Sequence, residues 1–272
     1  SIDVSATKTG AGGTAVLWSD IHDAAAQTRA HGTIWAKGGV EGGDGGRIET
    51  SGHRLDIAGS QGGASALRGH AGEWLLDPYD VTITGANANG AWSGGDWTPS
   101  ADSSTILNTD IASKLESGTN VTIATGSAGG QNGDITVAAA IAKTSGAADV
   151  TLRLNAANSI AVNAAIQHTG GDGKLHVILD ADNNNGARDG AGIILLNNDI
   201  GTGGGNLQFG TGATLAINGV STQVGGDVYV AGSGVRTLAT SGGNVAVNGE
   251  MIIANTSGLA IATAGGNVSF GG

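Results

Sequence analysis

The sequence predicts an all-β protein built as a parallel β-helix, a solenoid whose coils stack their short strands on one another. Three observations predict this fold. Glycine supplies 51 of the 272 residues, far above the average of about 7% in proteins, so turns are frequent and long helices are disfavoured. A short glycine-led phrase recurs along the chain. After each such turn, apolar and polar residues alternate, which is typical of strands with one buried face.

The clearest copies of the phrase lie in the last third of the chain. They are GGNLQFG from Gly204, GGDVYVAG from Gly225, GGNVAVNG from Gly242 and GGNVSFGG from Gly265, at steps of 21, 17 and 23 residues. This spacing predicts coils of about twenty residues with two or three strands each. At roughly 4.8 Å per coil, about a dozen coils would form a rod about 55–60 Å long.

Two other β folds explain the pattern less well. A β-sandwich joins its strands by hairpins, and Asn-Gly pairs at 89–90, 132–133, 218–219 and 248–249 allow hairpins locally. A sandwich nevertheless gives no reason for one phrase to repeat. A calcium-binding β-roll would show a tandem GGxGxDxUx nonapeptide, which the sequence lacks.

One segment departs from the period. We expect a single β-helix segment over residues 1–272, interrupted by a loop-plus-helix excursion at residues 85–118. Residues 103–117 predict one short α-helix outside the coils, with Ser103 or Ser104 as its N-cap. Lys114 in the last turn and Gly118 just after it are typical of a helix end.

The apolar face of this helix needs a surface to pack on. That face comprises Leu107, Ile111 and Leu115. The stretch GEWLLDPYDVTI, residues 72–83, is the one place where large apolar residues crowd together, so we expect the helix to pack there. The structural motif of this stretch is Trp74, Leu75, Leu76, Asp77 and Pro78. Pro78 cannot donate to a strand ladder and marks the strand end, and Asp77 is expected to accept hydrogen bonds from nearby backbone amides.

Two tryptophans mark a candidate ligand-binding loop. Trp92 and Trp97 lie in the polar stretch GANANGAWSGGDWTPS. Paired tryptophans on a polar loop are suited to stacking on sugar rings. Local packing within the excursion explains the same residues, so both interpretations stay open.

Composition excludes several classes of protein. The net charge is −11, from 12 basic and 23 acidic residues, so the chain lacks the basic face that a nucleic-acid partner requires. It contains no apolar run of about 18 residues, and we expect no membrane insertion. It contains no cysteine, which fits either an exported chain that must stay unfolded or a cytosolic one. The beginning SIDVSATKTG has no features of a signal peptide, so we expect a segment of a longer protein.

A resemblance to one family rests on the stretch around Pro78. The phrases GRIETSGHRLDIAGSQGG, GEWLLDPYDVTI and LESGTNVTIATG, in this order, resemble the filamentous-haemagglutinin-like exoproteins of Gram-negative bacteria, the large adhesins exported by two-partner secretion. The matching positions are Leu75, Leu76, Asp77, Pro78, Val81, Ile83, Leu115, Gly118, Thr119, Asn120, Val121 and Thr122. The likeness covers most of residues 32–270, and the family's amino-terminal secretion motifs are not visible in it.

The resemblance implies a right-handed parallel β-helix, secretion to the cell surface and a role in adhesion. The partners it implies are a glycan or protein receptor on a host or neighbouring cell, and an outer-membrane export partner. We expect no enzyme activity and no required cofactor, with calcium as a candidate ligand. The resemblance does not fix the ligand, because function resides in sites rather than folds.

The strongest candidate for a metal site is DADNNNGARD, residues 180–189. Asp180, Asp182, Asn184 and Asp189 supply oxygen ligands at a spacing that suits calcium. The loop lacks the glycine at position six and the glutamate at position twelve of an EF-hand. An Asn- and Asp-rich loop between coils is the alternative.

Parallel β-helices also include polysaccharide lyases and hydrolases, which need carboxylates clustered near a base. The candidate carboxylates are Asp44, Glu49, Asp56, Asp180, Asp182, Asp189 and Asp199, with Arg153 and Arg188 as candidate bases. No pair among the six histidines has the spacing of a helical zinc site. We therefore expect an adhesin segment, with a carbohydrate-active enzyme and a passive spacer as alternatives.

Overall fold

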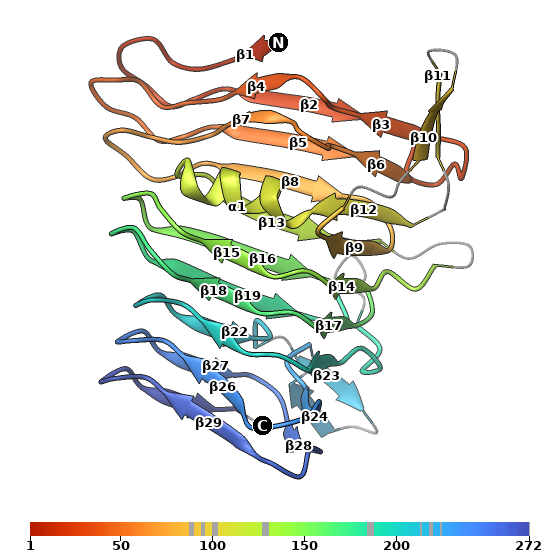
Figure 1. Ribbon diagram of the computed structural model, residues 1–272, viewed down its shortest axis with the longest axis vertical. Coiled ribbons are helices and arrows are strands. Elements are labelled where there is room, and N and C mark those ends of the chain that lie inside the picture. The colour runs from red at the N-terminus through yellow and green to blue at the C-terminus, as the bar shows by residue number, and fades with distance from the viewer. Residues whose placement is uncertain are drawn as a thin grey trace.

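The computed structural model describes residues 1–86, 90–93, 96–99, 103–126, 131–183, 188–212, 214–217, 220–223 and 225–271. In this part of the chain, short strands alternate with turns and stack into the three faces of one parallel β-helix (Figure 1). The chain descends from the red N-terminal strands at the top of Figure 1 to the blue C-terminal strands at the bottom. The predicted parallel β-helix is confirmed.

Face A is a nine-stranded sheet in which every described neighbour pair is parallel. Its strands, in stacking order, are β2 (Thr14–Trp18), β5 (Arg47–Ser51), β8 (Glu73–Asp77), β13 (Asn120–Ala124), β16 (Val150–Asn155), β19 (Leu175–Asp180), β22 (Leu207–Phe209), β27 (Val245–Val247) and β30 (Val268–Phe270).

Face B consists of a parallel pair followed by a seven-stranded parallel sheet. The pair is β3 (Gln27–Arg29) and β6 (Arg54–Asp56), and the sheet is β12 (Ser104–Leu107), β9 (Val81–Thr84), β14 (Ile135–Val137), β17 (Ile160–Val162), β20 (Ile194–Leu196), β25 (Val228–Val230) and β28 (Met251–Ile253). The backbone N–H of Leu55 donates to Oγ of Ser104 over 3.0 Å, which joins the pair to the sheet.

Face C is divided by the helix. Its upper sheet is β1 (Ile2–Asp3), β4 (Thr33–Trp35) and β7 (Gln61–Gly63), and its lower sheet is β15 (Ile141–Lys143), β18 (Ile166–His168), β21 (Ile200–Gly201), β26 (Arg236–Ala239) and β29 (Leu259–Ala262). The helix α1 (Asn108–Glu116) lies between the two sheets (Figure 1).

Hydrogen bonds fix α1 in the wall of the β-helix. Asp110 accepts from the backbone N–H of Gly59, above it, over 3.0 Å. Glu116 accepts from the backbone N–H of Thr144, below it, over 2.8 Å. The helix therefore takes the place of a face C strand, and the expectation that it lies outside the coils is wrong.

The start of α1 also differs from the expectation. Residue 104 belongs to β12, and the N-cap position is Leu107, which makes no side-chain capping hydrogen bond. The sequence pattern did not predict this because the Ser104 hydroxyl does not cap the helix. It accepts a hydrogen bond from the backbone N–H of Leu55, in the coil above. Ile111 and Leu115 are fully buried, as the predicted apolar face requires.

Two antiparallel hairpins interrupt the parallel sheets. One is β10 (Gly90–Ser93) with β11 (Asp96–Pro99), and the other is β23 (Thr214–Ile217) with β24 (Val220–Gln223). The first stands clear of the stacked strands at the upper right of Figure 1.

The core is a column of inward-facing residues in strict register. On face A, one row passes from Ile48 through Trp74, and the next passes through Leu76; each inward residue lies over its counterpart in the next coil. The side chains of both rows are almost entirely inaccessible to solvent from β5 to β27. Burial of each such large apolar side chain contributes about 1.5–3 kcal/mol, so this column supplies much of the driving force for folding.

Coil length varies more than the recurring phrase indicates. Successive face A strands lie 23 residues apart at Val245 and Val268, but 47 residues apart at Glu73 and Asn120. The predicted period of about twenty residues and the count of about a dozen coils are therefore wrong, since face A has nine strands. The phrase from Gly225 leads into face B, not face A. A glycine pair can precede a strand of either face, so the phrase marks strand starts rather than coils.

Candidate functional site

The longest connections between described strands of different faces, residues 181–193 and 210–227, lie on the edge between faces A and B. Connections from face C to face A are also long in the first coils, at residues 4–13, 36–46 and 64–72. Connections from face B to face C take three to five residues, apart from α1, which follows β12 directly. Connections from face A to face B include much longer ones, and we call this side the presenting edge. Its long loops are residues 19–26, 125–134, 181–193 and 210–227, the last containing the β23–β24 hairpin.

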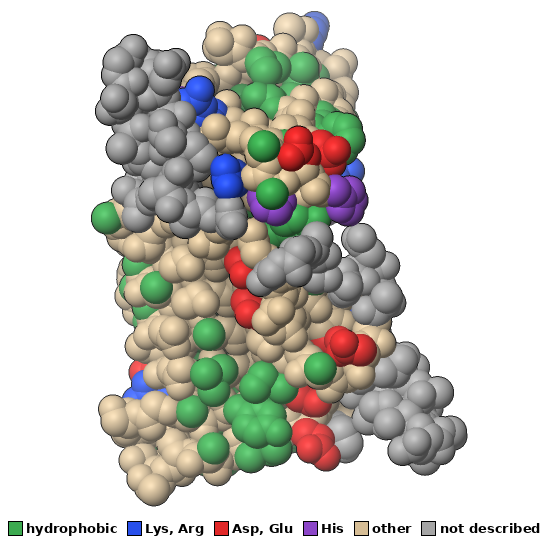
Figure 2. Space-filling view, turned by 90° about the vertical axis from the view of Figure 1, so that its right-hand side faces the viewer, with side chains coloured by type: hydrophobic (Ala, Val, Ile, Leu, Met, Phe, Trp, Pro, Cys, Tyr) green, Lys and Arg blue, Asp and Glu red, His purple; other side chains and the backbone are tan. Residues whose placement is uncertain are grey.

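The presenting edge is chemically mixed. Figure 2 shows acidic side chains distributed along it, histidines next to carboxylates in its upper part, and a hydrophobic patch low on the molecule. The walls of a β-helix must keep a constant period to stack, whereas a corner loop can grow outward without disturbing the sheets. Insertions at one edge are therefore compatible with the regular core.

The β10–β11 hairpin carries the two tryptophans proposed for ligand contact. Trp92 and Trp97 are Cα partners across the two antiparallel strands. The structure describes the backbone of these strands, so the side-chain roles predicted for Trp92 and Trp97 lie outside the described part. What the backbone shows is that the two positions face each other on one hairpin.

The loop after β19 contains the proposed calcium ligands. Asp180 is buried, and its Oδ2 lies 2.6 Å from Nη2 of Arg188. The other terminal nitrogen of Arg188 donates to the carbonyl of Ala181 over 2.7 Å. Arg188 thus supplies at Asp180 the positive charge that a cation would supply.

Asp182 is also used within the loop. Its backbone has a φ of 54°, and its carboxylate accepts from the backbone N–H groups of Asp189 at 3.0 Å and Gly190 at 2.9 Å. Burial raises the pKa of Asp182, and these hydrogen bonds oppose the rise. Asn184 lies outside the described residues. No group of three or more His, Cys, Asp or Glu side chains that could hold a metal occurs among the residues described, and calcium binding stays a prediction.

The remaining candidate carboxylates are distributed over different edges. Asp44 accepts from the backbone N–H of His70 over 2.7 Å, and Asp199 accepts from that of Thr237 over 2.8 Å. Asp56 lies 2.9 Å from Nε2 of His31. These contacts fix turns between coils, and the sites do not share one groove. Arg188 is occupied as described above, and Arg153 stands on the outer row of face A.

A cluster that sequence reasoning missed holds the first coils together at the presenting edge. The ring of Tyr79 meets the ring of His53 edge-on, with 4.7 Å between centroids. Its hydroxyl lies 3.0 Å from Nδ1 of His22. His53 Nδ1 donates to the carbonyl of Ile21, and its Nε2 accepts from the Gln131 amide. The signal in the sequence was a polar or aromatic residue at every second position around this corner.

Asp77 occupies an unusual position beside this cluster. Its main-chain carbonyl accepts from Gly52, but its carboxylate makes none of the described hydrogen bonds or ion pairs, so the expectation that it accepts from backbone amides is wrong. Burial raises the pKa of Asp77 to about 6, and the nearby charge of Glu49 adds to the rise. A half-buried carboxylate without a partner costs stability when it is ionised.

This cost predicts a pH dependence. The pKa of Asp77 is about 6 in the folded protein against 3.8 ordinarily, so the folded state binds the proton more tightly and stability falls as pH rises between these values. Asp77→Asn is expected to remove that slope and to raise the free energy of unfolding at pH 7 by roughly 1–2 kcal/mol. Urea unfolding from pH 4 to 8 measures it. Asp44→Asn, at an exposed site, is the control; an unchanged slope in Asp77→Asn would contradict the assignment.

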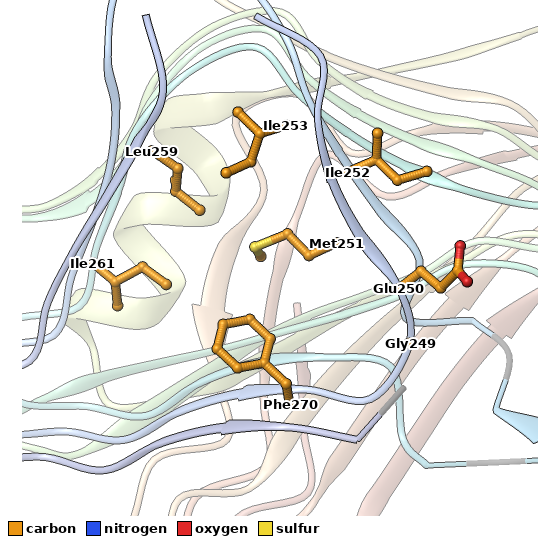
Figure 3. A pocket seen from close by; sticks show the side chains of 8 residues that line it. All are labelled: Gly249, Glu250, Met251, Ile252, Ile253, Leu259, Ile261 and Phe270. Carbon is orange, nitrogen blue, oxygen red and sulfur yellow. The ribbon is translucent and has the colours of Figure 1, made fainter.

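A pocket lies where the sheets end at β28, β29 and β30. It has a volume of about 560 Å³ and is lined mainly by Met251, Ile253, Leu259, Ile261 and Phe270, with Glu250 on its rim (Figure 3). Met251 and Phe270 continue the inward rows of Val228 and Val247. The pocket is therefore the last layer of the interior column, open to solvent, with the composition of the core rather than of a catalytic site.

Comparison with known proteins adds no family. No protein-family model matches the chain, and no curated protein matches it either. In the part of the chain that the structure describes, no helix combines the length and apolar character needed to cross a bilayer. The resemblance to two-partner-secretion adhesins therefore stays a prediction.

Proposed function

We propose that this chain is a segment of a secreted cell-surface adhesin, in which the β-helix is a stiff shaft and its insertions are the attachment surfaces. The single observation that supports this most is that the two longest corner connections, residues 181–193 and 210–227, lie on the presenting edge, while the face B to face C connections stay short. A solenoid that served only as a spacer would have no need for corner connections of this length.

The chemistry of the edge fits attachment better than catalysis. Most candidate carboxylates are engaged in turn-fixing hydrogen bonds or ion pairs, whereas a hydrolase or lyase needs carboxylates that converge on one bond. The proposed partners are a glycan or protein receptor on a host or neighbouring cell, and an export partner in the outer membrane of a Gram-negative bacterium. No cofactor is required by this proposal, and calcium at residues 180–189 would act, if bound, on the shape of one insertion.

Binding of the purified segment to cells and to a glycan panel tests the proposal. The double variant Trp92→Ala/Trp97→Ala is expected to weaken binding about tenfold, because stacking on an aromatic ring contributes about 0.5–1.5 kcal/mol per ring beyond burial. Shortening the β23–β24 hairpin tests the presenting edge itself. Leu67→Ala, at a side chain that is 76% exposed on the edge between faces C and A, is the matched control.

Three outcomes separate the alternatives. Binding that is lost with the insertions and kept in Leu67→Ala supports the adhesin. Release of shorter products from a polysaccharide would instead establish a carbohydrate-active enzyme. If the wild-type segment binds no cell, glycan or protein receptor, the chain is a spacer and the proposal fails.

A further inference from the structure

The outer surface of the first three coils carries chemistry that the lower coils lack. Trp18, Ser51 and Asp77 are in register on β2, β5 and β8. Val16 and Glu49 are in register two residues earlier on β2 and β5, so they belong to the same side of the sheet. Adjacent parallel strands lie about 4.8 Å apart, so these side chains share one small area of face A. In the coils below, Ala124, Asn155 and Asp180 occupy the row of Asp77. We call Val16, Trp18, Arg47, Glu49 and Asp77 the outer patch.

Trp18 provides a flat apolar surface open to solvent. Its side chain is 67% exposed and that of Val16 is 55% exposed. Tryptophan is rarely left so exposed, because burying its ring is strongly favourable. The indole therefore resembles a stacking platform more than a packing residue.

The polar groups of the outer patch are oriented in advance. Glu49 is held by Nη2 of Arg47 at 3.0 Å and by Oγ of Ser51 at 3.1 Å, so its carboxylate is fixed at the surface with little rotational freedom. The carboxylate of Asp77, in contrast, has none of the described partners. A polar group left without a hydrogen bond in a native structure calls for an explanation, and donors from a bound ligand would provide one.

The neighbouring corner fixes the back of the patch. Burial raises the pKa of Tyr79, and the charges of Asp20 and Asp77 add to the rise. The Tyr79 hydroxyl lies 3.0 Å from Nδ1 of His22, and its ring packs edge-on against His53. Contacts of this kind orient a surface before a ligand binds, which lowers the entropy cost of binding.

We propose that the outer patch binds an uncharged saccharide, with the apolar face of one sugar ring stacked on Trp18 and hydroxyl groups donating to the carboxylates of Glu49 and Asp77. The patch lies on face A, whereas the proposed function assigns attachment to the insertions, so either can fail alone. No bond is made or broken at this site; it is a recognition site.

Charge selects the class of sugar. On β2, β5 and β8 the only basic side chain is Arg47, already paired with Glu49, while Glu73 and Asp77 add negative charge. A uronic acid or a sulfated sugar would bring like charge next to these carboxylates, which is unfavourable. Neutral hexose polymers meet no such repulsion.

Calorimetric titration of the segment with neutral oligosaccharides (mannan, dextran and cellulose fragments) and with hyaluronan as the acidic counterpart tests the proposal. We expect binding to at least one neutral oligosaccharide and none to hyaluronan. Trp18→Ala should weaken it at least tenfold without changing thermal stability. Asp77→Asn should weaken oligosaccharide binding several-fold, although the variant is expected to be more stable than the wild type. Weaker binding in a more stable protein would not be expected if Asp77 had only a structural role.

The controls keep this site distinct from the insertions. In Trp92→Ala/Trp97→Ala the binding should be unchanged, and the fluorescence change of Trp18 on binding is then easier to detect. Equal affinity in Trp18→Ala and wild type, preference for hyaluronan, or no binding to any neutral oligosaccharide at millimolar concentration would each overturn the proposal. If oligosaccharide binding is lost in Trp92→Ala/Trp97→Ala but fully retained in Trp18→Ala, the insertions are the attachment site and the outer patch is not.

Discussion

Replacing Trp74 with alanine is expected to lower the free energy of unfolding by about 4 kcal/mol, in the range found for large aromatic residues removed from cores. Trp74 is fully buried and lies between Ile48 and Val121 in the inward row of face A. Its Nε1–H donates to Oγ1 of Thr50 over 3.2 Å. Truncation therefore leaves a cavity and an unsatisfied hydroxyl in the same layer.

A third loss makes this position more sensitive than a simple core site. Nζ of Lys114, on α1, lies 4.2 Å from the centre of the indole ring. Lys114 is almost entirely buried, and burial lowers its pKa to about 8, with Asp110 opposing the change. At pH 7 the ammonium is charged, and the ring is one of the few groups that stabilise it. Without the ring, α1 should separate from the coil before the lower coils unfold.

Urea unfolding with hydrogen exchange measures both the size and the place of this effect. Trp74→Phe keeps a ring beneath Lys114 and should cost less than half as much as the alanine variant. Trp18→Ala removes an exposed indole of the same size and should change stability by less than about 0.5 kcal/mol. Uniform loss of exchange protection over all nine face A strands, instead of loss centred on β8 and α1, would show that the helix is not an independent unit.

Trp74 also shows how far the sequence could predict the fold. Alternation after glycine turns was sufficient to predict strands, and repetition of one phrase was sufficient to predict a solenoid, because each coil satisfies the same local rules. The crowding of apolar residues at 72–83 indicated one contact of α1, that of Lys114 with Trp74, but the helix lies mainly against β15, β13 and β12. The contact itself was not predictable, since it is made by a lysine that helix-end rules place in solvent.

Coil length was beyond the sequence for a different reason. Glycine pairs precede strands of more than one face, so Gly225 at a corner before face B looks the same as Gly242 at a corner before face A. Strand stacking depends on the register between segments about 23 to 47 residues apart. This pairing cannot be predicted from the local pattern of a single sequence. The same limit applies to the outer patch. Trp18, Glu49 and Asp77 belong to three separate phrases, and only stacking brings them together.

Lys143 is a second position where loss of one side chain should be severe. It is fully inaccessible to solvent at the end of β15. Its Nζ donates to the carbonyls of Ser145 at 2.8 Å, Gly146 at 3.2 Å and Gly173 at 2.8 Å. The first two belong to its own corner and the third to the corner of the next coil. The ammonium group of Lys143 therefore joins two consecutive turns. It donates to turn carbonyls, which lie outside the hydrogen-bonded strands.

Lys143→Met is expected to cost about 3 kcal/mol, because a buried carbonyl left without a donor costs about 1–3 kcal/mol and water can reach part of this corner. Burial lowers the pKa of Lys143, while Glu116, Asp149 and Asp172 oppose the change, so the cost of holding the charge is partly offset by surrounding carboxylates. Methionine keeps an unbranched chain of similar length and removes the ammonium, so the measurement reports the loss of the three hydrogen bonds together with the charge. Lys174→Met, at an exposed lysine of the neighbouring turn, should be neutral within about 0.5 kcal/mol. If both variants unfold at the same urea concentration, water must replace the ammonium at no cost, and the joining of the two turns must depend on their glycines.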